Sequence, residues 1–543
     1  MKMKLFIPLA LLLTIGMVAI TGCQKGDLID NPNVAGNGSI VPVSLLLNEL
    51  TATLIRSNEQ PWAASGVANQ YDVANYSYYR GSNSYSFGST SDSYDILKYA
   101  DALQAQATSQ QGNQTNKYFA LSLFFKAYSG IWLSQRVGDI PFSEAGSSSV
   151  LTPKYDTQHD VYKNALALLD NANTLLSNLQ TATPSLSTTV LDASGDIFGF
   201  TYLQWQKLIN TYRLRVLISL SKRATDNADL QIPQQFATII GNPTKYPIMT
   251  SNADNMVYKF NATNRYPTFS LGYNPYNNFA NIGSTFINPL VATQDPRIFI
   301  TSTPAPAPVA AGKSVSDFTA YVGSDITQSQ ATLLNNSNAG LYSFANYNRY
   351  YLSSTGASAE PFVFIGYSEM CFNIAEAINR GWVTGTSATW YTNGINASLA
   401  LYGLTNGQVV TINFPVTSTD PAVNPGKFAQ GAAWGTATVN IPQFLSNVAY
   451  AGDNAAGLTQ ILTQKYISMF NNSGWEAFYN YRRTGLPAFA QGGPGIGTAN
   501  NLLPRRWLYP QSEVNYNSTN YKAAITSQFG GSDDPTKDTW LTK

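Results

Sequence analysis

Apolar residues recur at intervals of three and four along much of the chain, which is the spacing of one face of an α-helix. Two such stripes are Tyr118, Leu121, Phe125, Tyr128 and Trp132, and Val161, Ala165, Leu168, Ala172 and Leu175. The second stripe follows Thr157, with Asp160 three residues later, a spacing that satisfies free backbone donors at a helix start. The pattern therefore predicts two long helices in this region.

A third long helix is predicted over residues 201–223, because apolar residues there cover two faces and so indicate a helix packed between neighbours. One face carries Trp205, Leu208, Tyr212 and Val216, and the other carries Leu214 and Leu217. The C-terminal half contains three more helical stripes, namely Tyr367, Cys371, Ile374 and Ile378, then Tyr391, Ile395, Leu399 and Tyr402, then Leu458, Leu462, Tyr466 and Met469. Gly381, after Arg380, predicts the end of the first of these helices.

Long helices that arrive in pairs predict a mainly α fold with little β structure, built as an array of helical hairpins similar to tetratricopeptide stacking. No strict sequence repeat accompanies the pattern. Long stretches without periodicity separate the helices, and we expect them to be irregular loops: 69–91, 224–285, 299–362 and 403–440. Long loops in a compact protein are usually functional, so these stretches are where a binding site is expected.

The N-terminus has the pattern of an export signal, since Lys2 and Lys4 precede the apolar run Leu5–Ile20. Pro8 and Gly16 interrupt that run, and it falls short of the ~20 residues that a membrane-spanning helix needs. The tetrad Ile20-Thr21-Gly22-Cys23 resembles a bacterial lipobox. We therefore expect a signal peptide over 1–22, a lipidated Cys23 at the start of a tether over 23–43, and a folded domain over 44–543. Several acyl chains would anchor the protein without a spanning segment.

Composition narrows the classes of ligand. Charged residues are 12% of the chain, about half of the usual ~25%, while aromatic residues reach 13%. A net charge of +1 without runs of Lys or Arg argues against nucleic acid. A neutral, tyrosine-rich surface suits sugars, because their apolar faces stack on rings while their hydroxyls bond to amides and phenols.

Tyrosine-rich loops supply the candidate ligand-binding residues. Tyr76, Tyr78 and Tyr79 alternate with small or polar residues outside helical periodicity, which favours partial exposure of their rings. Trp434 lies in an Ala/Gly-rich stretch that is expected to be a loop. The complete candidate set is Tyr76, Tyr78, Tyr79, Tyr85, Tyr273, Tyr276 and Trp434. The alternative interpretation is that some of these rings fill gaps in the core.

Catalytic chemistry finds little support. The single histidine, His159, lies in the opening turn of a helix, so no usual Ser or Cys nucleophile has a base, and no metal or cofactor is expected. Cys371 lies in an apolar helical pattern and is predicted to be buried. Asp139 and Glu144 are the carboxyl pair that a glycoside hydrolase would need about 5 to 9 Å apart, but their Pro141 turn is expected to be structural.

Glu369 and Glu376 share one helical face, which in a charge-poor protein predicts buried ion pairs that fix how helices dock. Arg482 and Arg483 are their expected partners, because a guanidinium can hold a carboxylate through two hydrogen bonds. We therefore expect a binding protein with no catalytic residues.

Several motifs in a fixed order resemble the SusD/RagB family of outer-membrane nutrient-binding lipoproteins, and more closely its SusD-like branch. They are Asp30-Asn31-Pro32-Asn33, Gly138-Asp139-Ile140-Pro141-Phe142-Ser143-Glu144-Ala145, Thr152-Pro153-Lys154-Tyr155-Asp156, Trp205 with Leu214-Arg215, Asp295-Pro296-Arg297, Glu369 with Ala375-Glu376-Ala377 and Arg380-Gly381-Trp382, Gln464-Lys465-Tyr466, Tyr481-Arg482-Arg483-Thr484-Gly485-Leu486-Pro487, and Arg505 with Tyr509-Pro510-Gln511-Ser512-Glu513 and Asn517. The resemblance covers most of the chain.

The resemblance implies a tetratricopeptide-containing scaffold, a ligand surface built on loops, and a SusC-type TonB-dependent barrel as partner. Its ligand residues lie in variable loops, so none is carried over to this chain. We expect a lipid-anchored outer-membrane protein, exposed at the cell surface, that binds a glycan or oligosaccharide and delivers it to that transporter. A peptide-binding or adhesive surface lipoprotein and, more remotely, a glycoside hydrolase are the alternatives.

Overall fold

The computed structural model of the protein describes residues 40–146, 149–268, 278–352 and 360–543. Helices dominate it, and the predicted mainly α fold is confirmed. The α-helices are α2 (Val43–Thr53), α3 (Ala64–Ala68), α4 (Ser77–Arg80), α5 (Tyr94–Gln111), α6 (Lys117–Val137), α7 (Gln158–Ala182), α8 (Tyr202–Ser219), α9 (Ile232–Gly241), α10 (Ser284–Thr293), α11 (Ile298–Thr301), α12 (Pro306–Ala310), α13 (Gln330–Asn338), α14 (Tyr367–Asn379), α15 (Ser387–Leu401), α16 (Ile441–Asn447), α17 (Ala455–Ser468), α18 (Glu476–Thr484), α19 (Gln511–Tyr516) and α20 (Ser518–Phe529).

The strands are short and, within the described residues, form three antiparallel two-stranded sheets. They are β1 (Asp72–Ala74) with β3 (Ala280–Ile282), β2 (Met256–Tyr258) with β4 (Phe362–Ile365), and β5 (Val409–Asn413) with β6 (Ala433–Thr438). Each sheet joins segments that a helix or a long loop separates in the sequence. Two of the sheets therefore join parts of the chain that are distant in the sequence, and the β5/β6 sheet closes the connection of residues 414–432.

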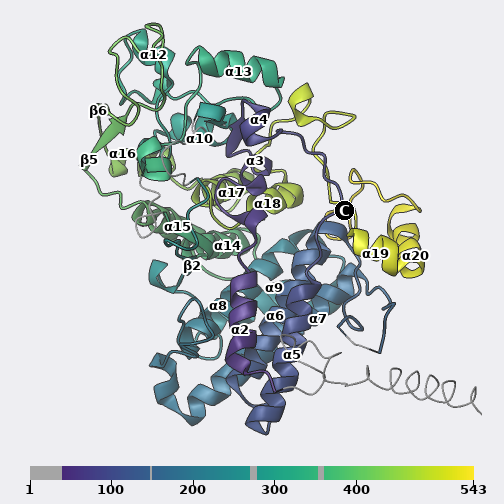
Figure 1. Ribbon diagram of the computed structural model, residues 1–543. Coiled ribbons are helices and arrows are strands. Elements are labelled where there is room, and N and C mark those ends of the chain that lie inside the picture. Colours follow the sequence, from purple (N-terminus) through teal and green to yellow (C-terminus); the bar gives the residue numbers. More distant parts are fainter. Residues whose placement is uncertain (1–39, 147–148, 269–277, 353–359) are drawn as a thin grey trace, which may run out of the picture.

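The long helices pack as neighbouring pairs. Helix α6 contacts both α5 and α7, α7 contacts α8, and α14 contacts α15 and α17. Figure 1 shows α2 and α5 to α8 side by side in one half of the molecule, while α10, α12, α13, α16 and the β5/β6 pair occupy the other half. The second half carries the long connections, so the helical array serves as the base on which the loops are built.

Local sequence signals set the ends of these helices. The Thr157 side chain accepts a hydrogen bond from the Asp160 N–H at the start of α7, as predicted. At α8, Thr201 and Gln204 form a complete capping box. Helix α14 ends at Asn379 with Arg380 as its C-cap, and Gly381 follows with φ of +74°, a conformation that glycine adopts without strain.

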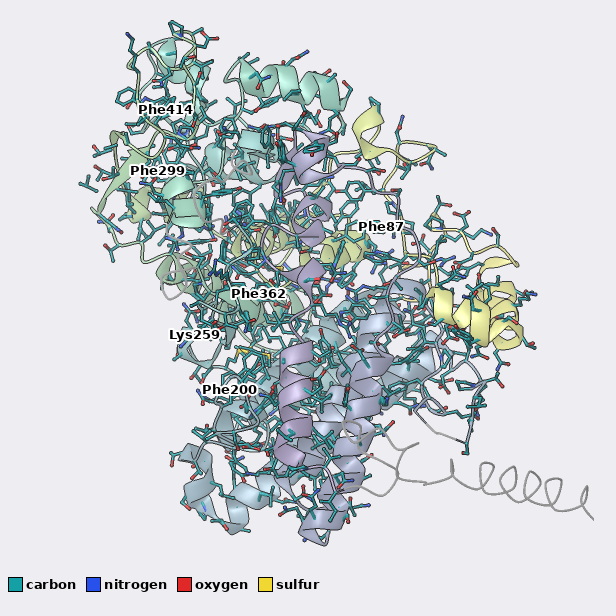
Figure 2. All side chains as sticks on the ribbon, in the orientation of Figure 1. Phe87, Phe200, Lys259, Phe299, Phe362 and Phe414 are labelled. Atoms are coloured by element: carbon teal, nitrogen blue, oxygen red, sulfur yellow. The ribbon has the colours of Figure 1, made fainter. Side chains whose placement is uncertain are left out.

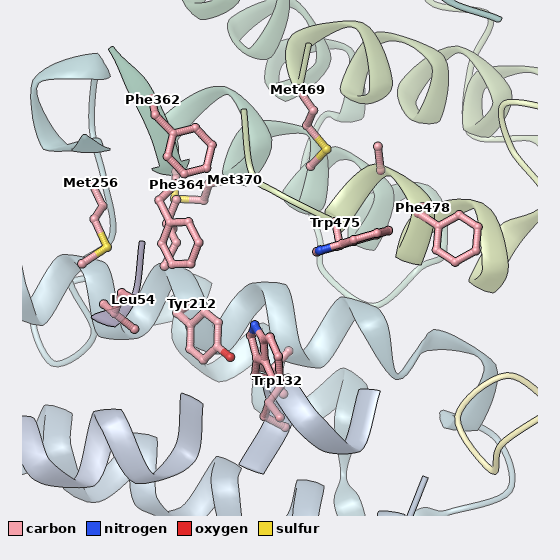
Figure 3. Packing of buried hydrophobic residues seen from close by; sticks show 14 of the residues in the cluster. Leu54, Trp132, Tyr212, Met256, Phe362, Phe364, Met370, Met469, Trp475 and Phe478 are labelled. Atoms are coloured by element: carbon pink, nitrogen blue, oxygen red, sulfur yellow. The ribbon is translucent and has the colours of Figure 1, made fainter. Parts of the chain in front are cut away.

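A continuous aromatic core holds the two halves together. Trp205, fully buried in α8, meets Phe124 of α6 with ring centroids 5.8 Å apart. Figure 3 shows Trp132 and Tyr212, from α6 and α8, close to Phe364 of β4, Met370 of α14 and the C-terminal Trp475. Because these side chains come from the helical array and from the C-terminal half of the chain, the two halves share one core.

The stretches that were predicted to be irregular contain regular elements. Helix α4 lies in 69–91, α9 in 224–285, α12 and α13 in 299–362, and the β5/β6 pair in 403–440. The prediction that these stretches lack elements was therefore wrong, although long irregular segments separate the elements. The helices are short, and a short helix gives too few turns for an apolar stripe to stand out; α9, for example, buries only Ile232, Phe236 and Ile239.

Candidate functional site

The β1/β3 pairing brings the first tyrosine-rich loop next to the second. Ala74, the last residue of β1, is opposite Ala280, the first residue of β3, and the Asn75 N–H donates to the Phe279 carbonyl over 3.0 Å. The chain leaves β1 at Tyr76 and enters β3 from Phe279. These two residues therefore lie at the same end of the ladder although they are far apart in the sequence.

Four aromatic rings meet at this end and form what we call the tyrosine cluster: Tyr76, Tyr78, Tyr79 and Phe279. Tyr79 stacks on Phe279 with centroids 4.7 Å apart, and Tyr78 meets Tyr79 edge to face at 4.8 Å. Tyr76 lies 5.1 Å from Phe279 and 5.7 Å from Tyr79. Tyr76, Tyr78 and Tyr79 are 37%, 80% and 43% exposed, so a contiguous aromatic surface faces solvent.

Buried polar contacts hold the loop that carries the tyrosine cluster. The Asn83 side chain accepts from the Ala74 N–H and donates to the Ala74 carbonyl, both over 2.8 Å, which closes residues 74–83 into a loop. Arg80 forms an ion pair with Asp72 and donates to the Trp62 carbonyl over 3.0 Å. Burial raises the pKa of the Asp72 carboxyl, and the Arg80 guanidinium acts in the opposite direction. These contacts therefore fix the backbone that carries the rings of Tyr76, Tyr78 and Tyr79.

Side-chain amides lie beside the rings. Asn75 donates to the Asn278 carbonyl over 3.1 Å, and the Gln430 amide lies 3.4 Å from the Asn278 side-chain oxygen. Both Asn278 and Gln430 are partly exposed. Amides of this kind can donate to and accept from the hydroxyls of a ligand that stacks on the rings.

A cavity of about 480 Å³ begins where α4 ends. This volume falls within the ~300 to 1,000 Å³ of typical small-molecule sites. Aromatic rings form part of its wall: Phe87 stacks on Trp507 with centroids 4.2 Å apart, and Trp475 meets Trp507 edge to face at 5.0 Å. Figure 2 labels Phe87 close to the C-terminal segment. Serines of the segment 82–91 also line the cavity and supply hydroxyls to it.

The structure brings only some of the sequence candidates together. Tyr76, Tyr78 and Tyr79 share the tyrosine cluster, whereas Tyr85 is 2% exposed, lines the cavity and donates its hydroxyl to the Ala68 carbonyl over 2.9 Å. Tyr273, Tyr276 and the lipidation candidate Cys23 lie outside the described residues.

Trp434 was expected in a loop, and the structure corrects this. It lies on β6, half-buried, with its ring edge to face against Phe414 of the segment that follows β5, at 5.1 Å. Small residues around Trp434 suggested a loop, but the β5/β6 ladder pairs Ile412 with the adjacent Gly435 and so fixes the segment as a strand.

The charged residues that the sequence singled out in the C-terminal half are structural. Arg483 binds Glu376 through two hydrogen bonds, one of them 2.9 Å long, as predicted. Glu369, however, pairs with Arg215 of α8 over 2.7 Å. Arg482 was expected to bind a carboxylate and instead donates to the carbonyls of Arg505 and Gln135. Sequence spacing could not reveal that Arg215 approaches Glu369 from another helix.

The remaining candidates for chemistry have separate partners. Burial raises the pKa of Asp139 to about 6, and its carboxyl accepts from the Gln158 N–H over 2.7 Å. Glu144 pairs with Lys154 at the surface. His159 lies between Asp160 and Asp229. Cys371 is fully buried with a free thiol. Within the described residues, no group of three or more His, Cys, Asp and Glu side chains is placed to hold a metal ion.

Sequence reasoning missed several residues that shape the site: Phe279, Asn278, Trp62, Trp475 and Trp507. Phe279 belongs to the second tyrosine-rich stretch, so its composition was a signal, but the β1/β3 pairing that places it was not visible. The tryptophans come from opposite ends of the chain, and only the fold brings them to one wall. In the described part of the chain, no helix has both the length and the apolarity to cross a membrane.

Comparison with solved structures shows close overall similarity to SusD homologues. One from Bacteroides fragilis is 27% identical, with a TM-score of 0.74 over 93% of this chain and 100% of that one. A second from the same organism is 29% identical, with a TM-score of 0.70 over 93% and 99% of the two chains. A chitin-binding protein shares the fold at 21% identity, with a TM-score of 0.61 over 92% and 97%.

No curated protein sequence matches the chain. The profile of the SusD-like family, described as starch-binding and associating with the outer membrane, matches residues 39–510. This match spans most of the chain and includes the helical array, the tyrosine cluster and the cavity. The chain therefore belongs to the SusD-like family of the SusD/RagB group.

Proposed function

We propose that the protein captures a glycan at the tyrosine cluster and the adjoining cavity. The observation that carries this proposal is the exposure of three tyrosine rings in one contiguous group, with Tyr78 80% exposed. Rings of this size are usually buried in a core or an interface, so a group held at the surface on a polar base indicates a contact site for a ligand. The family description as starch-binding supports a carbohydrate ligand.

The chemistry of capture follows from the side chains present. A sugar ring would lay its apolar face on a tyrosine ring, while its hydroxyls would exchange hydrogen bonds with Asn278 and Gln430. No bond is made or broken in this process. The carboxylates Glu369 and Glu376 are committed to arginines in the core, which supports binding without catalysis.

The place of capture is inferred from the sequence and the family. We propose that residues 1–22 are removed, that Cys23 carries the lipid, and that 23–43 tether the domain of residues 44–543 to the outer membrane, facing outward. The family description as associating with the outer membrane supports this arrangement. Delivery of the captured glycan to a SusC-type TonB-dependent barrel completes the proposal, with reversible binding allowing release.

The direct test is binding of a soluble form that begins at Gln24 to soluble starch, chitin oligosaccharides, dextran and a set of peptides. Affinity electrophoresis and calorimetry would measure binding, and the same mixtures would be analysed for released sugars. Retardation by a glycan without released sugars is the expected result. Binding to peptides alone would support the peptide-capture alternative, and release of sugars would show a hydrolase.

A further inference from the structure

The cavity beside the tyrosine cluster is bordered by two arginines, and both are already neutralised. Among the described residues that line it, Arg80 and Arg136 are the ones that carry charge. Each forms an ion pair with a carboxylate on the protein side, Asp72 and Glu59 respectively. The cavity therefore has cationic side chains in its wall without a net positive charge.

The Arg136 pair is buried and fully engaged. Its guanidinium donates to Glu59 over 2.6 Å and to the Trp132 carbonyl over 2.9 Å, and it lies 3.4 Å from the centre of the Trp132 ring. The Trp132 indole N–H donates to the same Glu59 oxygen over 2.7 Å. The side chains of Arg136 and Glu59 are 2% and 5% exposed. A ligand anion would have to compete with this network.

The Arg80 pair lies nearer the tyrosine cluster. Asp72 is 1% exposed at its side chain and Arg80 is 10% exposed, so the carboxylate sits behind the guanidinium and the guanidinium borders the cavity. Asp72 lies on β1, whose register fixes it opposite Ile282. The backbone thus holds the negative charge where it compensates Arg80 but does not itself line the cavity.

The other polar groups that line the cavity are neutral. They are hydroxyls, amides and indole N–H groups, from Ser82, Ser84, Ser86, Ser89, Thr90, Ser91, Asn58, Asn83, Tyr85, Trp62, Trp475 and Trp507. The neighbouring tyrosine cluster is also uncharged. These groups exchange hydrogen bonds with sugar hydroxyls, but they carry no positive charge to offset the cost of transferring a carboxylate or sulfate from water into the cavity.

We propose that Asp72 and Glu59 are specificity-determining residues that make this site select uncharged glycans and reject those carrying carboxylate or sulfate groups. The inference rests on the proposed function, because it concerns the glycan captured at that site. An anionic sugar at Arg80 or Arg136 would have to share a guanidinium with the carboxylate that already pairs with it, or displace that carboxylate and leave it buried and unpaired. Binding of an uncharged glycan, by contrast, changes no charge pairing and should depend little on salt.

The test compares derivatives of one polymer on the soluble form that begins at Gln24. Hydroxyethyl and carboxymethyl derivatives of starch and of dextran add similar bulk, but only the carboxymethyl group is charged. For the polymer that binds, we expect the affinity of the protein for the carboxymethyl form to be about tenfold or more below its affinity for the hydroxyethyl form. Between low and high sodium chloride, the affinity for the hydroxyethyl form should change by less than about twofold.

Two variants assign the effect to the named residues. Asp72→Asn removes the compensating charge behind Arg80, and Glu59→Gln does the same behind Arg136. Each variant should narrow or reverse the preference for the hydroxyethyl over the carboxymethyl form. Each should also make binding of the carboxymethyl form salt-sensitive. Using both keeps the assignment testable if one variant does not fold. Tighter binding of the carboxymethyl form to the unaltered protein would overturn selection while leaving glycan capture intact. No binding of any polymer, charged or uncharged, would overturn both proposals.

Discussion

Tyr79 lies nearly parallel to Phe279, with ring centroids 4.7 Å apart and planes 14° apart, although the two residues come from segments far apart in the chain. One face of the Tyr79 ring is therefore covered by the protein, and the side chain is still 43% exposed. The stacking restricts the motion of the Tyr79 side chain before a ligand binds. Preorganisation of this kind lowers the entropy lost on binding.

Replacing Tyr79 with alanine should weaken glycan binding with little effect on folding. An aromatic contact contributes about 1 kcal/mol, so the dissociation constant should rise roughly fivefold to tenfold. Calorimetry with the glycan that binds best would measure the change. Tyr516→Ala is the matched control, because Tyr516 is a 78% exposed tyrosine on α19 outside the site. Equal losses in the two variants would contradict the assignment of the tyrosine cluster.

Asn83→Ala should loosen the base of the same loop without removing any ring. The change deletes the two hydrogen bonds to Ala74, so the Ala74 N–H loses its Asn83 acceptor while the Ala74 carbonyl keeps the Gln330 amide, at a cost of about 1 to 3 kcal/mol. We expect weaker glycan binding together with faster proteolysis of the loop near Tyr78. Asn113→Ala, which affects an exposed turn between α5 and α6, should alter neither measurement.

The helical array was predictable because long amphipathic helices repeat their signal over several turns. Trp205, Leu208 and Tyr212 fell on one face in the sequence and are buried on one face of α8 in the structure. The short elements were not predictable for the converse reason. Each strand contributes three to six residues, and its partner is chosen by contacts across the whole fold.

The candidate site was likewise predictable only in part. Tyr76, Tyr78 and Tyr79 stood out because polar neighbours separate them from any apolar stripe, and the structure finds them exposed. Nothing in the sequence indicated that Phe279 would complete the cluster, since this depends on the β1/β3 register. Tyr85 resembled its neighbours in composition, but a hydrogen bond to the Ala68 carbonyl fixes it inside the wall of the cavity.

The thiol of Cys371 should be unreactive in the folded protein. Cys371 is fully buried, and burial raises its pKa to about 12, so the reactive thiolate is scarce at neutral pH. The soluble form from Gln24 has no other cysteine. A thiol reagent at pH 8 should therefore modify the native protein only as fast as it unfolds, and the unfolded protein at once. Rapid modification under native conditions would show that α14 opens locally.

Glu376→Gln should destabilise the fold while leaving glycan affinity unchanged in the molecules that remain folded. Glu376 is fully buried between Arg483 and Arg380, and removing one partner of a buried pair costs about 3 to 5 kcal/mol. Urea unfolding would measure the loss. Glu144→Gln, at the surface pair with Lys154, is the control and should leave the unfolding midpoint unchanged. Loss of binding without loss of stability would mean that Glu376 belongs to a ligand site.

The same variant should reveal when the ion pair is lost in acid. Burial alone would raise the pKa of Glu376, but the guanidiniums of Arg483 and Arg380 outweigh it and lower the pKa from 4.5 to about 2. A carboxyl with a lowered pKa in the folded state stabilises the fold fully above its ordinary pKa, and this contribution disappears as the pH falls toward the lowered value. The shift corresponds to about 3 kcal/mol.

The difference in unfolding free energy between the unaltered protein and Glu376→Gln should therefore stay constant from pH 7 to about 5 and shrink between about pH 4.5 and 2. Other carboxyls titrate in both proteins and cancel in the difference, so a difference that stays constant down to pH 2 would show that this carboxyl is not held ionised by its arginines.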